Sequence, residues 1–183
     1  VEYLLAHHAE ERIYLVGTDE LGEQFRASGL QVTDDPERMD VLVGSWDREF
    51  DYETMRTVLQ AAEEETAFVG TDPDRTFPDE DGLMPGSGAI IAALAGVLGR
   101  YPDAVLGKPG ALAAETVLER LGCDPERCFV VGDRLDTDIA LGERAGMTTA
   151  LVLSGITAES DIHNSEVRPD YVLDSLADIG RLL

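Results

Sequence analysis

Short apolar runs alternate with helical patterns along most of this sequence, and the alternation limits the possible folds more than any other feature. Strands are predicted at residues 13–16, 41–43, 67–69, 105–106, 128–131, 149–153 and 171–173. Helices are predicted at residues 1–10, 20–28, 52–65, 87–98, 111–121, 137–144 and 176–182. Strands that alternate with helices form a parallel sheet covered on both faces, so the predicted fold class is α/β.

Single residues mark the ends of several of these helices. Asp51 precedes the helix at 52–65 and is a suitable N-cap, whereas Gly122 and Gly146 follow helices and favour a left-handed C-cap. The segment 71–85 is rich in Asp, Pro and Gly and is predicted to be a long loop. These signals agree with the alternation of strands and helices.

The chain contains a single lysine, Lys108, among 14 basic side chains. It lies between Gly107 and Pro109, directly after the predicted strand at 105–106. An ammonium group acts as a compact point charge, unlike a planar guanidinium, and a neighbouring glycine lets backbone approach a ligand closely. Because parallel sheets bind ligands beyond the carboxyl ends of their strands, Lys108 is predicted to contact a phosphate.

Three aspartates follow the predicted strand at 128–131. Asp133 comes first, and Asp136 and Asp138 lie in the first turn of the next helix. Magnesium prefers oxygen ligands, usually one or two carboxylates together with waters and phosphate. Asp133 is therefore predicted to ligate Mg²⁺, and Asp138 is assigned to the same metal site, mainly to orient it. Asp136 and Thr137 equally suit capping of a helix N-terminus.

The net charge of −23 limits the partners of the protein. Such a surface repels a phosphodiester backbone, which argues against nucleic acid. No apolar run reaches the length of a membrane span, and 44% hydrophobic residues suffice for a core. We therefore expect a soluble, cytoplasmic protein. The 37 acidic residues and the single lysine favour a salt-adapted cytoplasm over a basic partner. Assembly into a homo-oligomer is left open.

The two cysteines, Cys123 and Cys128, are separated by four residues. A zinc site needs more ligands than these two, and the histidines lie far away in the sequence. They are predicted to be thiols at a helix end and a strand start in a reducing cytosol.

Several segments together resemble the haloacid dehalogenase superfamily. Its last two catalytic motifs are similar to Gly107-Lys108-Pro109 and residues 130–139, followed by residues 145–147 and 151–155. Residues 71–74, 77–78 and 82–88 resemble the cap signature of the NagD-like and nitrophenylphosphatase-like branch, with Asp72 where that branch usually has Asn. The resemblance extends over essentially the whole chain.

The resemblance implies a Rossmann-like parallel-sheet core, incomplete at its N-terminus, with an inserted α/β cap domain. Residues 1–11 would be a core helix segment, residues 12–101 the cap, and residues 102–183 the C-terminal part of the core. An acidic receiver domain is a weaker alternative, because Gly17-Thr18 rather than acidic residues follow the first predicted strand.

The resemblance also implies an activity. Proteins of this superfamily transfer phosphate from a small phosphate ester to an aspartate and then to water, with Mg²⁺ bound. By this resemblance Lys108 steadies the phosphate and Asp133 ligates the metal. Asp72 and Asp74 would help to shape the substrate pocket, as would Gly107 and Pro109 beside the lysine. Phosphoryl transfer depends mainly on positioning and charge neutralisation, which agrees with these roles.

The resemblance leaves the nucleophile unassigned within the chain. It requires an apolar strand followed by D-x-D-G, which is expected upstream of Val1. Residues 79–82 match D-x-D-G by letter but follow no apolar strand, so Asp79 and Asp81 are not expected to be nucleophiles. The chain alone is therefore predicted to be inactive. The alternative function is a catalytically inactive fragment that acts as a binding or regulatory module.

Overall fold

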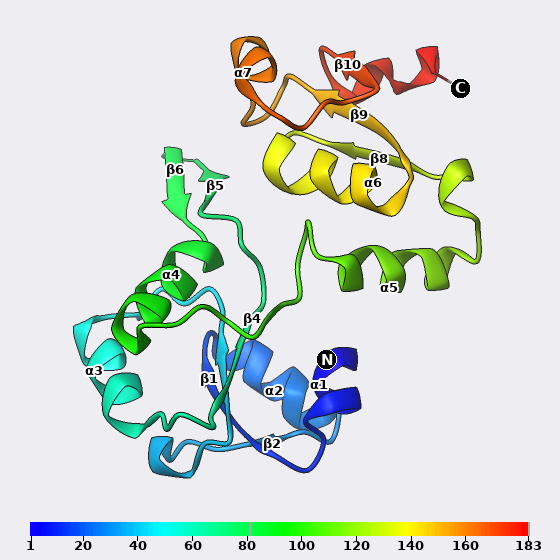
Figure 1. The fold of residues 1–183 in the computed structure, drawn as a ribbon. Helices are drawn as coiled ribbons and strands as arrows, with labels where there is room; N and C mark the ends of the chain where they lie inside the picture. The colour runs from blue at the N-terminus through cyan, green and yellow to red at the C-terminus, as the bar shows by residue number, and fades with distance from the viewer. Residues whose placement is uncertain (81, 183) are drawn as a thin grey trace. The chain divides into compact units, whose positions relative to one another are not determined.

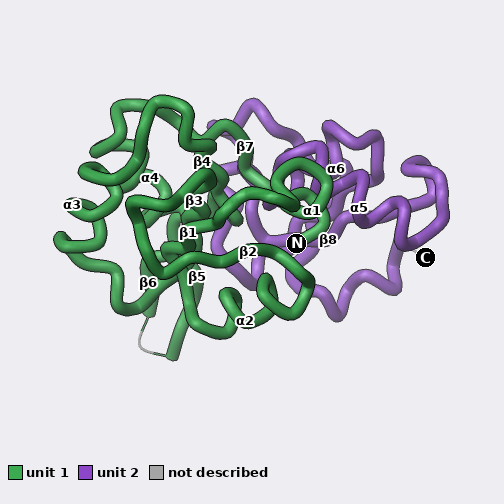
Figure 2. The backbone as a smooth tube through the Cα atoms, turned by 90° about the horizontal axis from the view of Figure 1, so that it is seen from below, with its two compact units in different colours: residues 1–106 green, residues 107–183 purple. Residues whose placement is uncertain are grey.

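A computed structural model describes residues 1–80 and 82–182 (Figure 1). The chain divides into two compact units, residues 1–106 and residues 107–183 (Figure 2). Within the described ranges, no helix has both the length and the apolar character needed to cross a membrane.

The first unit is built on a parallel sheet with the strand order β2-β1-β3-β4-β7. Its strands are β1 (Arg12–Val16), β2 (Gln31–Val32), β3 (Val41–Gly44), β4 (Ala67–Gly70) and β7 (Ala104–Val105). Its helices are α1 (Glu2–His7), α2 (Asp19–Ala27), η1 (Pro36–Arg38), α3 (Tyr52–Ala61) and α4 (Ser87–Leu98). The parallel α/β class predicted from the sequence is confirmed.

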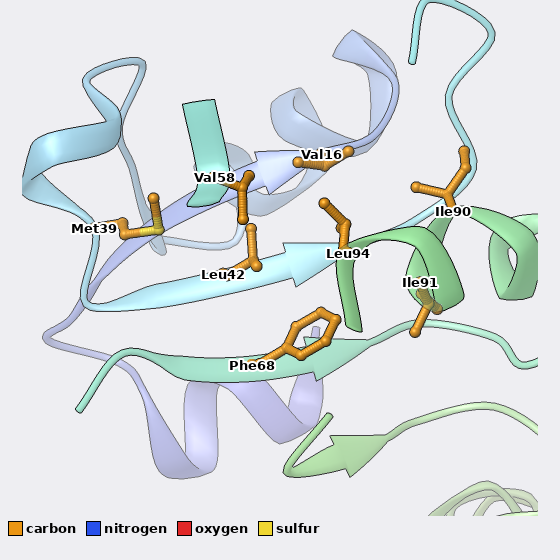
Figure 3. Packing of buried hydrophobic residues seen from close by; sticks show 8 residues of the cluster. All are labelled: Val16, Met39, Leu42, Val58, Phe68, Ile90, Ile91 and Leu94. Carbon is orange, nitrogen blue, oxygen red and sulfur yellow. The ribbon is translucent and has the colours of Figure 1, made fainter. Parts of the chain in front are cut away.

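Both faces of this sheet are buried. Because successive side chains of a strand point to opposite faces, Leu42 faces one side of β3 whereas Val41 and Val43 face the other. Figure 3 shows the first cluster, in which α3 and α4 cover the sheet with the residues Val16, Met39, Leu42, Val58, Phe68, Ile90, Ile91 and Leu94. The second cluster contains Leu4, Ile13, Phe25, Leu30, Val41, Val43 and Val69.

The ends of the first unit differ from the domain limits expected from the sequence. Helix α1 belongs to this unit, because Leu4 is fully buried against Ile13 and Phe25. Strand β7 pairs with β4, so the unit continues to residue 106, beyond the expected cap limit at 101. The assignment of the chain to a cap and a core stays a prediction.

The segment 71–85 is not the long loop predicted from its composition. Strands β5 (Thr76–Asp79) and β6 (Gly82–Pro85) form an antiparallel pair in the first unit. The pairing places Phe77 opposite Met84, and Phe77 meets Trp46 edge to face at 5.7 Å between ring centroids. Cross-strand packing therefore outweighs the low strand propensity of Asp, Pro and Gly.

The second unit contains the parallel sheet β10-β9-β8. Its strands are β8 (Phe129–Gly132), β9 (Thr148–Val152) and β10 (Tyr171–Leu173). Its helices are α5 (Ala111–Leu121), η2 (Pro125–Arg127), η3 (Leu135–Ile139), α6 (Ala140–Ala145), α7 (Glu159–Asn164) and η4 (Leu176–Arg181). Gly122 and Gly146 adopt the left-handed conformation after α5 and α6, as their positions predicted.

Several helices differ from their predicted form. The predicted helix at 137–144 consists of a π-helical turn, η3, followed by α6. The predicted helix at 176–182 is the 3₁₀ helix η4, and α7 was not predicted. Helix α3 starts at the Asp51 cap, where the Asp51 carboxylate accepts the Thr54 N–H at 2.8 Å, but it ends at Ala61 rather than at 65.

Candidate functional site

Lys108 and Asp138 form an ion pair in the second unit. The Lys108 Nζ donates to Asp138 Oδ1 at 2.5 Å. The Asp138 side chain is 9% exposed and that of Lys108 is 41% exposed, so the anion of the pair is buried and the lysine side chain is partly exposed. Both residues were predicted to lie in one site, and the structure brings them together across 30 positions of the chain.

The second oxygen of Asp138 holds the backbone of the preceding loop. Asp138 Oδ2 accepts the N–H groups of Asp133 and Arg134, both at 3.2 Å. The π-helical turn η3 places the carboxylate beneath this loop, because the Asp138 N–H returns to the Arg134 carbonyl at 3.1 Å. Asp138 therefore ties the lysine to the loop that carries Asp133. Its contacts support the orienting role more than that of a metal ligand.

Asp133 follows β8 and is fixed by the loop that follows β9. Its Oδ2 accepts the Ile156 N–H at 2.9 Å, and its carbonyl accepts the Thr157 N–H at 3.1 Å. No described residue donates a hydrogen bond to Asp133 Oδ1. That oxygen is therefore available to a cation or a ligand. The role of Ile156 was missed from the sequence, because a backbone N–H leaves no signature there.

Two glycines leave room for these carboxylates. A Cβ on Gly132 would lie 2.2 Å from the Asp138 Cβ, and a Cβ on Gly155 would lie 2.1 Å from Asp133 Oδ2. Neither distance is compatible with a side chain. Both glycines lie within the motifs that carry the resemblance. Their tertiary neighbours explain why a residue without a side chain is needed at each position.

Asp136 and Thr137 differ in burial. Asp136 is exposed, which agrees with a position at the start of a helical turn rather than with metal binding. The Thr137 hydroxyl is buried without a hydrogen-bond partner among the described residues. A buried hydroxyl without a partner costs about 1–3 kcal/mol.

Gly107 and Pro109 shape the turn that presents Lys108. The Gly110 N–H donates to the Gly107 carbonyl at 2.9 Å, and the Lys108–Pro109 peptide is cis. Arg144 of α6 donates to the Pro109 carbonyl at 3.3 Å. These contacts position the lysine, whereas the predicted contact of Gly107 and Pro109 with a substrate stays a prediction.

Asp72 and Asp74 lie in the first unit, at the edge of a hollow of about 340 Å³. The Asp74 N–H donates to Asp72 Oδ1 at 2.9 Å, which folds the segment into a tight turn. The hollow is lined by Trp46, Asp72, Asp74, Thr76, Phe77, Gly86 and Ser87. It combines two carboxylates with two aromatic side chains.

Gly86 and Gly88 let the aspartate loop pack against the start of α4. A Cβ on Gly86 would lie 2.3 Å from the Asp74 carbonyl oxygen, and one on Gly88 would lie 2.1 Å from that of Pro73. The Gly88 N–H donates to the Asp74 carbonyl at 3.0 Å. The Gly-Ser-Gly spacing thus permits close packing of the loop against the helix.

Asp79 ends strand β5, and its carboxylate lies 3.6 Å from Arg48. It belongs to a two-stranded antiparallel pair and does not follow a strand of the parallel sheet. Asp81 lies outside the described residues. The surroundings of Asp79 give no support to a nucleophilic role.

The chemistry of Asp133 suits a hard cation. Over residues 1–80 and 82–182, no cluster of three or more His, Cys, Asp or Glu side chains could hold a metal ion. Asp133 Oδ1 nevertheless accepts no hydrogen bond from the described residues, and it lies on the loop that Asp138 links to Lys108. A magnesium ion needs only one or two protein carboxylates when waters and phosphate complete its shell, so the donor set fits it in part.

A parallel α/β fold with a lysine and two aspartates after its strands is typical of the haloacid-dehalogenase-like hydrolases, and this chain belongs to that family. The HAD-hydrolase-like family model matches residues 105–179. The p-nitrophenyl phosphatase from Archaeoglobus fulgidus is 35% identical, with a TM-score of 0.87, over 100% of this chain and 71% of that chain. The 4-nitrophenylphosphatase from Thermotoga maritima is 34% identical, with a TM-score of 0.87, over 98% of this chain and 68% of that chain.

The curated relatives are longer than this chain. The sugar-phosphatase AraL from Bacillus subtilis is 32% identical over 180 residues, which is 98% of this chain and 65% of the relative. The chain thus spans about two thirds of the length of the relatives that it matches. The matches confirm the resemblance to the NagD-like and nitrophenylphosphatase-like branch.

Proposed function

We propose that this chain is part of a magnesium-dependent phosphatase of small phosphate monoesters. The observation that carries the proposal is the chain of contacts from Lys108 through Asp138 to the Asp133 loop. It holds a cation and a free carboxylate oxygen in a fixed relation, which is what phosphoryl transfer requires. The names of the relatives, which include sugar phosphatase and nitrophenylphosphatase, support this substrate class.

Each side chain has a proposed role. Lys108 binds a phosphate oxygen and balances the charge of the attacking carboxylate, while Asp138 keeps its ammonium group in place. Asp133 would hold the Mg²⁺ through Oδ1. When bound, this ion neutralises charge on the transferring phosphoryl group. The aspartate that accepts the phosphoryl group is proposed to lie in a segment outside these 183 residues.

Asp72 and Asp74 are proposed to take part in substrate binding, as the resemblance implies, through the hollow that they line in the first unit. Carboxylates accept hydrogen bonds from hydroxyl groups, and the aromatic side chains of Trp46 and Phe77 offer apolar area. Two carboxylates in one small hollow also repel an anionic leaving group. We therefore favour an uncharged, hydroxylated or aryl leaving group.

Substitution of the proposed ligand tests the metal site. In a version of the protein extended upstream by its natural sequence, Asp133→Asn should raise the magnesium concentration for half-maximal hydrolysis of an aryl phosphate by at least about 10-fold. Asp136→Asn is the matched control and should change it by less than about twofold, because Asp136 is exposed. Calorimetric titration of magnesium measures the affinities independently. Equal losses for the two variants would contradict the assignment of Asp133.

The 183-residue chain is the second control in this assay. Without the extension it should show no turnover, because neither Lys108 nor Asp133 can accept the phosphoryl group. Robust turnover by the short chain would contradict the proposed place of the nucleophile, and Asp79 and Asp81 would then be the first residues to replace.

The acidic composition supports a proposed location in a salt-adapted cytoplasm. Screening at molar salt weakens repulsion between exposed carboxylates, so the net charge of −23 predicts a melting temperature that rises by about 10 °C or more between low and molar potassium chloride. Thermal unfolding followed by circular dichroism measures this shift. A melting temperature that does not change with salt would instead favour a basic partner.

A further inference from the structure

The two cysteine sulfurs lie close together in the second unit. Cys123 Sγ and Cys128 Sγ are 2.7 Å apart, and both side chains are free thiols. A disulfide bond has a sulfur–sulfur distance of about 2.05 Å, so a small movement brings the two sulfurs to bonding distance. The sequence contains no other cysteine, so any internal disulfide must join these two.

The thiols differ in exposure and share one apolar cluster. Cys123 is half-buried, whereas Cys128 is 7% exposed. Both pack in the cluster that joins α5 and α6 to β8, with Ala114, Leu141 and Met147. The Cys128 thiol also donates to the Asp124 carbonyl at 3.4 Å. The fold thus holds the pair in contact through its own packing, and no rearrangement of the sheet is needed.

We propose that Cys123 and Cys128 form a covalent modification site, which a hydroperoxide oxidises to a disulfide and a thiol reductant restores. This state is additional to the reduced thiols predicted from the sequence, and it does not depend on the proposed phosphatase activity.

The more exposed sulfur starts the reaction. The Cys123 thiolate attacks a peroxide oxygen, the O–O bond breaks, and hydroxide leaves with a sulfenic acid remaining on Cys123. The Cys128 sulfur then attacks that sulfur, the S–O bond breaks, and water forms from the hydroxyl group and the thiol proton. In total, two thiols and one hydrogen peroxide give one disulfide and two waters.

Cys128 suits the second step because it is buried and its sulfur lies against that of Cys123. The hydrogen bond with Cys123 raises the pKa of the Cys128 thiol, and burial raises that pKa further. Burial and the raised pKa both slow the direct reaction of Cys128 with peroxide, so the more exposed Cys123 is oxidised first while Cys128 stays within reach.

The disulfide would join the end of α5 to the start of β8. Cys123 follows Gly122, the C-cap of α5, and Cys128 directly precedes β8. The other ends of these elements lead to Lys108 and Asp133. Closing the loop between the cysteines lowers the conformational entropy of the unfolded chain. The bond should therefore stabilise the part of the fold that carries the ion pair.

Tryptic digestion gives a direct test. Arg127 lies between the cysteines, with Arg120 and Arg134 on either side, so trypsin places the two thiols on separate peptides, residues 121–127 and 128–134. After treatment of the full chain with hydrogen peroxide, mass spectrometry should find the two peptides joined, lighter than their sum by two hydrogen atoms. Dithiothreitol should separate them.

Thermal unfolding gives the second readout. The oxidised protein should melt about 5 °C higher than the reduced protein, and a variant carrying Cys123→Ser and Cys128→Ser should melt at one temperature in both conditions. Three results would overturn the proposal: two thiols that still titrate after peroxide, disulfides found only between chains on a non-reducing gel, or a sulfinic acid on Cys123 as the main product.

Discussion

Lys108→Arg should lower the turnover of the upstream-extended protein by at least about 100-fold, the loss typical when one preorganised charge donor is removed. The ammonium group lies 2.5 Å from Asp138 Oδ1, and the lysine side chain is 41% exposed. A guanidinium would pair with Asp138 through its planar fork and move its charge away from the phosphate position. The unfolding free energy should change by less than about 1 kcal/mol, because a half-exposed cation remains paired.

Steady-state hydrolysis of an aryl phosphate and urea denaturation separate these two effects. Arg181→Lys is the matched control, since it makes the reverse exchange at an exposed arginine that pairs with Asp178 in the same unit. It should leave turnover and stability unchanged. A Lys108→Arg variant that keeps more than half of the activity would remove the main support for the phosphate-binding role of this lysine.

Gly132→Ala should destabilise the second unit by about 2–4 kcal/mol, at the upper end of the cost of overpacking. The new Cβ would lie 2.2 Å from the Asp138 Cβ and 2.4 Å from its Oδ2. Asp138 cannot swing away at low cost, because its carboxylate holds Lys108 and two backbone N–H groups. Either the end of β8 must shift or these hydrogen bonds must break, so turnover should fall together with stability.

Gly180→Ala is the control for this substitution. Gly180 lies in η4, and a Cβ there would have no neighbour within 4 Å. Its unfolding free energy, measured in urea, should stay within about 0.5 kcal/mol of the original. A Gly132→Ala protein as stable as the Gly180→Ala protein would show that the loop after β8 is not held as tightly as its contacts imply.

The sequence predicted the charged members of the site because their positions carry a signal. Lys108 is the single lysine and directly follows a strand-like run, and Asp133 ends another. In a parallel α/β fold such positions lie at the ligand-binding edge. Asp138 follows the same strand as Asp133 and was therefore predicted to belong to the same site. The ion pair confirms that it lies close to Lys108. The catalytic and metal-binding roles of these residues stay predictions.

The hairpin of β5 and β6 shows where prediction from local sequence failed. Its residues favour loops, and the pairing arises from partners that the local pattern does not reveal, such as Trp46 against Phe77. The π-helical form of η3 was likewise not predicted. It follows from the Asp138 carboxylate, which accepts a hydrogen bond from Arg134 in the preceding loop. Local propensities are small compared with such tertiary contacts.

The sequence by itself determined the α/β class, the parallel arrangement, several helix ends and the identity of the lysine and the aspartates, because periodicity, capping and strand ends are local properties. Only the tertiary structure decided which oxygen of Asp138 meets the lysine, which oxygen of Asp133 accepts no hydrogen bond from the described residues, and why Gly132 and Gly155 must lack side chains. It also brought the two cysteine sulfurs into contact. These features depend on the distance between atoms of separate segments, which packing sets and sequence spacing does not.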